Sequence, residues 1–87
     1  MQEITLFHLS SCPYCKRALQ YLEELQAENP VYAQIPITMI EESQQAALAD
    51  SYDYYYVPTF YIDEVKVHEG VVTKEIVKDI LQQATNK

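Results

Sequence analysis

The chain of 87 residues is long enough for one domain with one modest core, so we expect a single domain over residues 1–87. Its formal charge of −7 disfavours nucleic acid as a partner, because nucleic-acid-binding proteins usually gather Lys and Arg on one surface. No apolar stretch approaches the roughly 20 residues that cross a bilayer, and the N-terminus has no signal-peptide pattern, so we expect no membrane association and a cytoplasmic location.

The N-terminal third predicts a strand followed by a helix. Residues Ile4–Leu9 are almost all apolar, which is typical of a strand that is covered on both faces. Ser10–Ser11 break this run and are candidate caps for the helix that follows. Pro13 suits the first helical turn, and apolar residues recur at helical spacing as far as Leu25. We expect this helix to end at Asn29–Pro30.

The middle of the chain predicts a strand, a short helix and an aromatic segment. The strand is expected over Ile35–Ile40, and Pro36 near its start favours an edge position in the sheet. Ser43 is a candidate cap for a short helix over residues 44–51. We interpret the tyrosines of Tyr52–Tyr56 chiefly as core and loop packing. The alternative is an aromatic lip that grips a peptide substrate.

The C-terminal third predicts two strands and a final helix. Thr59–Ile62 and Val65–His68 have strand patterns and are joined around Asp63–Glu64, a turn without the glycine that tight hairpins prefer. Thr73 can cap the last helix. Its buried stripe is expected to comprise Ile76, Val77, Ile80, Leu81 and Ala84.

The order β-α-β-α-β-β-α indicates an α/β fold. A strand, a crossover helix and a second strand favour parallel pairing, whereas the two closely spaced final strands favour an antiparallel hairpin. We therefore expect a mixed four-stranded sheet with helices on both faces.

The segment Cys12-Pro13-Tyr14-Cys15 contains both cysteines of the chain. A disulfide needs Cα atoms roughly 4.4–6.8 Å apart, and one turn of helix provides that separation. The unpaired N–H groups at the start of a helix favour a negative charge, so Cys12 should ionise more readily than a free cysteine. We expect a reversible redox pair in which Cys12 attacks and Cys15 resolves. No structural disulfide framework and no metal site are expected.

The neighbours of Cys12 should stabilise its thiolate. The helix dipole alone is too weak, so hydrogen bonds from the Tyr14 and Cys15 N–H groups are expected to contribute. Pro13 shapes the helix start, and Lys16 is a further candidate if its ammonium reaches the sulfur.

Nearly the whole chain resembles a glutaredoxin of the thioredoxin-like superfamily. The resemblance rests on the strand Ile4–Leu9, the Cys-Pro-Tyr-Cys box, the segment Tyr56-Val57-Pro58-Thr59 about 45 residues later, and Gly70 ahead of the last helix. It implies a thioredoxin fold and a dithiol thiol–disulfide oxidoreductase. It also implies a cis peptide bond before Pro58, with the Val57 backbone pairing to bound glutathione.

The resemblance implies further partners and binding residues. Tyr14 would wall the groove, and His8, Gly70 and Val71 would contact glutathione. Glutathione would be a co-substrate, with no cofactor bound. Disulfide-containing or glutathionylated proteins would be the substrates of a monomer, and glutathione or a thioredoxin reductase would donate electrons.

Two residues depart from the family pattern. His8 stands where many glutaredoxins have a lysine that meets a glutathione carboxylate. Glu69 replaces the first glycine of a Gly-Gly pair and brings a carboxylate near an expected anion. Neither change favours tight glutathione binding, and neither alters the dithiol chemistry.

Three alternatives stay open at this point. The first is a thioredoxin-like reductant of protein disulfides, fed by a flavoprotein reductase. The second is an iron–sulfur or metal-binding module that uses the same thiolates. Because His8 and His68 lack zinc-finger spacing, the form of this alternative that we favour is a cluster shared between two chains. The third is a redox-inert interaction domain that merely retains the box.

Overall fold

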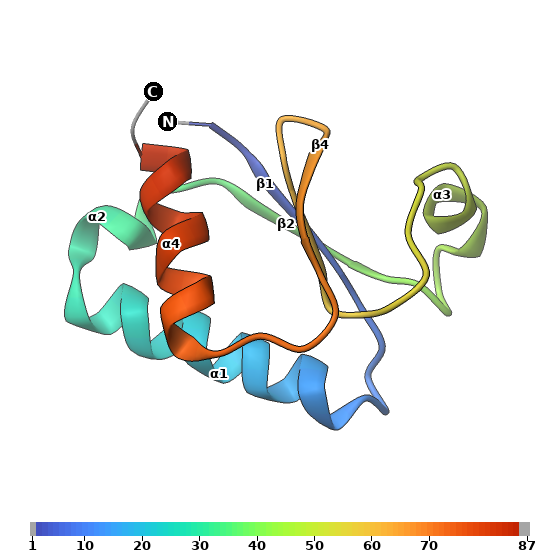
Figure 1. Ribbon diagram of the computed structural model, residues 1–87, viewed down its shortest axis with the longest axis horizontal. Coiled ribbons are helices and arrows are strands. Elements are labelled where there is room, and N and C mark those ends of the chain that lie inside the picture. Colours follow the sequence, from blue (N-terminus) through green and yellow to red (C-terminus); the bar gives the residue numbers. More distant parts are fainter. Residues whose placement is uncertain (1, 86–87) are drawn as a thin grey trace.

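The computed structural model describes residues 2–85 and contains four strands and four helices within them (Figure 1). No helix of this part of the chain is long and apolar enough to span a membrane. In chain order the elements are β1 (Ile4–His8), α1 (Pro13–Glu28), α2 (Pro30–Ala33), β2 (Ile37–Glu41), α3 (Ala46–Asp50), β3 (Thr59–Ile62), β4 (Val65–Glu69) and α4 (Lys74–Thr85).

The four strands form one mixed sheet in the order β2-β1-β3-β4. Strand β1 pairs parallel with β2 and antiparallel with β3, and β3 pairs antiparallel with β4. The predicted mixed sheet and the edge position of β2 are both confirmed. Because β1 is central, the loop at its carboxyl end presents the Cys-Pro-Tyr-Cys segment at one edge of the sheet.

Helices cover both faces of the sheet, as predicted. Side chains alternate along β1, so Leu6 joins the larger core cluster and Phe7 joins the smaller one. The larger cluster contains residues of α1, α2 and α4, which gather on one side of the sheet in Figure 1. The smaller cluster contains Ala49 of α3 and aromatic residues near it. The two cores hold the strands whose ends form the site.

Helix α2 was not predicted from the sequence. Asn29 and Pro30 end α1, as expected, but they also start the next helix. The Asn29 side-chain oxygen accepts the Val31 N–H at 3.1 Å, and Pro30 occupies the first turn. The chain therefore reaches β2 two residues later than predicted, and Ile35 packs in the larger core cluster outside the strand.

The predicted cap of α3 is wrong, whereas that of α4 is confirmed. The Ser43 N–H and hydroxyl both donate to Glu41 Oε1, at 2.6 and 2.7 Å. Helix α3 starts only at Ala46 and has no side-chain cap. At the start of α4, Thr73 Oγ1 accepts the Ile76 N–H at 3.2 Å. Ser43 does not cap the helix because its N–H and hydroxyl turn back to Glu41 and the helix begins three residues later, at Ala46, with Gln45 in the cap position.

The hairpin of β3 and β4 contains two irregular features. Asp63 and Glu64 turn the chain with φ values of 47° and 69°, the left-handed conformation that a tight hairpin requires even without glycine. Farther along, Tyr61 pairs with Lys66, but the neighbouring pair joins Phe60 to His68. Strand β4 therefore has one additional residue between those pairs, which is a β-bulge.

Candidate functional site

The Cys12 side chain caps helix α1. Its backbone is extended, and its sulfur accepts the Cys15 N–H at 3.2 Å. Its carbonyl accepts the Lys16 N–H at 3.1 Å, which begins the helical pattern. The prediction that Ser10–Ser11 would supply the cap is wrong, because the sulfur itself holds that position. The expected hydrogen bond from the Cys15 N–H to the sulfur is present.

The two thiols have different environments. Both cysteines are free, but Cys12 is partly exposed and Cys15 is only 1% exposed. Burial, together with the hydrogen bond to Cys12, raises the pKa of the Cys15 thiol to about 12. At neutral pH Cys15 therefore keeps its proton, while the Cys12 sulfur reaches solvent. This asymmetry matches the expected division into an attacking and a resolving thiol.

The segment before β3 lies against Cys12. The Val57–Pro58 peptide bond is cis, as the resemblance implies. The Cys12 sulfur is 4.0 Å from the Val57 carbonyl oxygen. Pro58 is buried, and its carbonyl oxygen accepts the Gly70 N–H at 2.8 Å. Three of the predicted binding residues, Val57, Pro58 and Gly70, are thus brought together, and Val57 lies beside the sulfur.

The comparisons with known proteins agree with this arrangement. A model of the glutaredoxin family matches residues 4–67. The chain belongs to the glutaredoxin family. Among curated proteins, none matches the chain significantly.

Solved structures similar to this family member have the thioredoxin fold. A mutant thioredoxin from Halobacterium salinarum is 23% identical, covers 97% of this chain and 74% of its own, and has a TM-score of 0.70. The oxidised thioredoxin of Plasmodium falciparum is 18% identical over 94% of this chain and 79% of its own, with a TM-score of 0.71. A thioredoxin-like protein of Clostridium perfringens is 28% identical over 100% of this chain and 73% of its own, with a TM-score of 0.70.

Other predicted site residues of this glutaredoxin-family protein are exposed near the helix start or on the adjoining loop. Tyr14 is 51% exposed and Val71 is 57% exposed. Pro13 and Lys16 are exposed on the first turn of α1. No hydrogen bond or ion pair links these four side chains to the Cys12 sulfur within residues 2–85. Their roles stay predictions.

His8 lies at the carboxyl end of β1 and is half-buried. It stands opposite Glu41 in the parallel pairing of β1 with β2, and its carbonyl accepts the Glu42 N–H at 2.9 Å. Its backbone thus belongs to the sheet edge that supports the site. A contact of its side chain with glutathione stays a prediction.

The tyrosines between α3 and β3 divide into two pairs. Tyr52 and Tyr54 pack on Phe7, with ring centroids 4.7 and 4.9 Å from the Phe7 ring. The packing interpretation is confirmed for this pair. Tyr55 and Tyr56 are 87% and 71% exposed, so they contribute little to the core.

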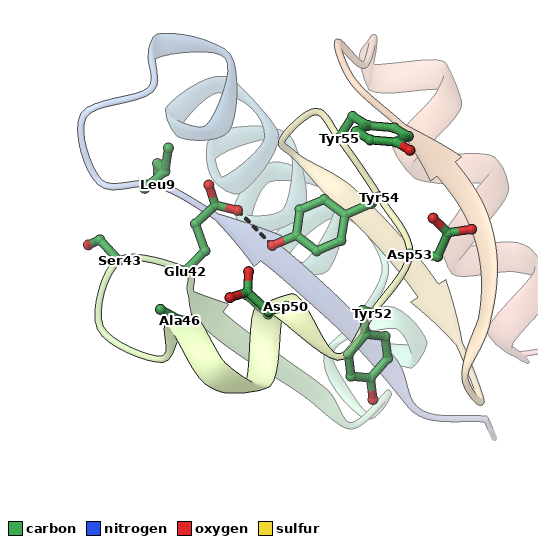
Figure 2. A pocket seen from close by; sticks show the side chains of 10 residues that line it. Leu9, Glu42, Ser43, Ala46, Asp50, Tyr52, Asp53, Tyr54 and Tyr55 are labelled. Atoms are coloured by element: carbon green, nitrogen blue, oxygen red, sulfur yellow. Dashed lines mark hydrogen bonds between the residues drawn. The ribbon is translucent and has the colours of Figure 1, made fainter.

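An open pocket of about 570 Å³ borders this segment (Figure 2). The Tyr54 hydroxyl donates to Glu42 at 2.6 Å, and burial together with this bond raises the pKa of Tyr54. Asp50 and Asp53 add two further carboxylates. Leu9 joins the pocket to the redox motif, since its carbonyl accepts the Cys12 N–H. This side of the site is therefore acidic. The full lining is Leu9, Glu42, Ser43, Ala46, Ala49, Asp50, Tyr52, Asp53, Tyr54 and Tyr55.

Two carboxylates, Glu41 and Glu69, support the loops of the site, a role that the sequence analysis predicted for neither. Glu41 Oε1 accepts both donors of Ser43, and Glu41 Oε2 accepts the Ser10 N–H at 3.3 Å. The Ser43 hydrogen bonds, more than that of Ser10, lower the pKa of Glu41 to about 2. Glu41 thereby ties the loop before Cys12 to the end of β2. A Glu-x-Ser sequence after a strand could have indicated part of this arrangement.

Glu69 supports the opposite loop. Its carboxylate accepts the N–H groups of Tyr55 and Tyr56 and pairs with Lys66. Lys66, followed by the two N–H groups, lowers the pKa of Glu69 to about 2. The sequence suggested a carboxylate near a bound anion. In the structure, that carboxylate is instead bound by Lys66 and by two backbone N–H groups of the protein itself.

Replacing Glu41 with Gln should make the free energy of unfolding fall less steeply as the pH is lowered. The folded-state pKa of Glu41 is about 2, below the ~4.3 of an unfolded glutamate. Its stabilising effect is therefore complete above the unfolded value and is lost as the pH falls towards 2. Urea unfolding at several pH values should show a smaller decrease for Glu41→Gln than for wild type. The same substitution at exposed Glu23 is the control, and equal slopes for all three proteins would contradict the prediction.

Proposed function

We propose that this protein is a dithiol thiol–disulfide oxidoreductase with Cys12 as nucleophile and Cys15 as resolving thiol. The observation that supports this most directly is the asymmetry of the two sulfurs. One is partly exposed at a helix N-terminus beside Val57, and the other is buried and protonated. A pair of this kind can take a substrate on one sulfur and release it with the other.

The proposed reaction begins when the Cys12 thiolate attacks one sulfur of a substrate disulfide. A bond forms between Cys12 and that sulfur, and the other substrate sulfur leaves as a thiolate that takes up a proton. Cys15 then loses its proton and attacks the Cys12 sulfur. The internal disulfide forms and the second substrate thiolate departs. The substrate gains two electrons and the protein loses two.

The high pKa of Cys15 is compatible with this second step. Part of its rise comes from the hydrogen bond and the charge of Cys12. Once Cys12 is bound in a mixed disulfide, that charge is gone, and the pKa of Cys15 should fall, although burial, the largest cause of its rise, remains. Cys15 thus becomes a better nucleophile only after the substrate has been captured.

We further propose disulfide-containing or glutathionylated proteins as substrates, with glutathione as co-substrate. Val57 would pair with the cysteinyl part of glutathione, with Tyr14, Gly70 and Val71 around it and His8 at its edge. Glutathione or a thioredoxin reductase would return the two electrons, and no cofactor need be bound. The only two cysteines lie in the motif, which suits a monomer in the reducing cytoplasm.

A second candidate is a thioredoxin-like reductant with little dependence on glutathione. The position of Glu69 favours this alternative, because its carboxylate lies at the end of β4 and occupies two N–H groups of the loop next to Cys12, and its charge is only partly offset by the ion pair with Lys66. A small anionic ligand gains less beside such a carboxylate than beside the glycine of many relatives.

Two assays on one preparation distinguish these candidates. The first measures reduction of a glutathione mixed disulfide with glutathione as donor. The second measures reduction of insulin disulfides with thioredoxin reductase as donor. Activity in the first supports the glutathione-linked function, and activity only in the second overturns it. Inactivity in both assays contradicts an oxidoreductase.

The metal-binding alternative is tested separately. Within residues 2–85 no three His, Cys, Asp or Glu side chains are grouped so that they could hold a metal ion. A cluster shared between two chains would draw ligands from both. Protein purified without oxygen should then contain bound metal and a visible chromophore.

A further inference from the structure

Two residues of the loop beside Cys12 are not held in place by side-chain packing, although Tyr54 and Val57 on either side of them pack against the smaller core cluster. Tyr55 and Tyr56, which precede Val57, expose 87% and 71% of their surface. Figure 2 shows Tyr55 beyond the packed ring of Tyr54. A segment with so few buried contacts is expected to be mobile unless its backbone is fixed by other means. Its position matters, because the Val57 carbonyl oxygen lies 4.0 Å from the Cys12 sulfur.

The Glu69 carboxylate fixes this backbone. Its Oε2 accepts the Tyr55 N–H at 2.6 Å and the Tyr56 N–H at 2.9 Å. Its Oε1 pairs with Lys66 Nζ at 2.7 Å, and the same ammonium donates to the Asp53 carbonyl at 3.1 Å. The Glu69 side chain is only 20% exposed. Hydrogen bonds to a partly shielded carboxylate are stronger than those between neutral groups, so this contact can replace the missing packing.

The bulge in β4 makes the contact possible. Residues three apart in a regular strand lie on opposite faces, so Lys66 and Glu69 would normally diverge. The additional residue, Val67, restores them to the same face, where Lys66 pairs with Tyr61 and Glu69 with Thr59. The ion pair and the loop therefore meet on one side of the sheet.

We propose that Glu69 is a positioning residue for the docking of protein disulfides, and that Lys66 orients its carboxylate. The inference rests on the proposed function. Under that function, a protein substrate whose sulfur meets Cys12 would also contact the Val57 backbone 4.0 Å away, so it would need this loop in one fixed position. A small disulfide engages chiefly the sulfur and depends less on the loop.

The test compares Glu69→Gln with wild type, using insulin and a small aliphatic disulfide as substrates. For insulin we expect KM to rise about tenfold, equivalent to ~1.4 kcal/mol, with kcat within about twofold. The KM for the small disulfide should change less than about threefold. Glu64→Gln, an exposed carboxylate in the turn of the same hairpin, is the matched control. An unchanged KM for insulin, or equal losses on both substrates, would overturn the proposal.

Amide hydrogen exchange separates this inference from the proposed function. The Tyr55 and Tyr56 N–H groups should exchange at least about tenfold faster in Glu69→Gln than in wild type and in Glu64→Gln. Unchanged exchange refutes the positioning role even if disulfide reduction is found. If wild type reduces no disulfide, the function fails, and the docking role fails with it even where the exchange result holds. Should Glu69→Gln not fold, Lys66→Met is measured in its place with the same expected directions.

Discussion

Replacing Cys12 with Ser is expected to abolish reduction of both insulin and a glutathione mixed disulfide, by at least about a thousandfold. A serine hydroxyl is not ionised near neutral pH and cannot form the mixed disulfide. Serine is also a favourable helix cap, so it can accept the N–H that the Cys12 sulfur now accepts from Cys15. The two assays above measure the loss, and thermal unfolding should show that the fold is kept.

The control for this experiment is Ser11→Ala, which alters the exposed residue next to Cys12 and should leave both rates within about twofold of wild type. If Cys12→Ser retained more than about a tenth of either activity, Cys12 would not be the nucleophile. Cellular function unaffected by Cys12→Ser would favour the redox-inert alternative.

Replacing Cys15 with Ser should separate the two routes. Net reduction of insulin is expected to fall by at least about a hundredfold, because nothing inside the protein can then displace the substrate from Cys12. Reduction of a glutathione mixed disulfide should persist, since free glutathione can resolve that intermediate. Mass spectrometry after reaction with insulin should detect the trapped species, joined through Cys12.

The burial of Cys15 calls for a second variant. The side chain is 1% exposed, and a serine there places a hydroxyl in an apolar site at some cost in stability. Cys15→Ala avoids that hydroxyl and should give the same split between substrates. Equal loss of both activities in two folded variants would contradict separate monothiol and dithiol routes.

The relative position of the two cysteines could be predicted because it is local in sequence. Cys12 and Cys15 are one helical turn apart, and Pro13 marks the helix start, so the short spacing already defines their relative positions. The sheet could be predicted for a similar reason, since apolar runs and crossover rules restrict the topology strongly.

Residues 29 and 43 show where local patterns mislead. The pair Asn29–Pro30 fits both the end of one helix and the start of another, and the sequence does not show that it serves as both. Ser43 looks like a cap until the strand end places the Glu41 carboxylate beside it. In each case the outcome depends on competing partners for the same backbone groups.

The hydrogen bonds from Tyr55 and Tyr56 to Glu69 could not be predicted at all. Glu69 meets Tyr55 and Tyr56 only because one additional residue in β4 changes the face on which it lies. A bulge has no reliable signature in a single sequence, and the strand pattern of Val65–His68 is compatible with regular pairing. Residues far apart in the sequence were therefore brought together by a register shift.

In the proposed reaction the Cys12 sulfur has two roles, because the atom that would attack the substrate also caps the first turn of α1. In the internal disulfide of the proposed reaction, this sulfur carries no negative charge and is a poorer acceptor for the Cys15 N–H than a thiolate is. Oxidation of Cys12 and fraying of the N-terminus of α1 are therefore thermodynamically coupled, since each favours the other. The free energy by which the cap stabilises the reduced protein, relative to the oxidised one, therefore contributes directly to its midpoint reduction potential. A substitution that strengthens the N-terminus of α1 for an anion should therefore make the protein a stronger oxidant without touching either thiol.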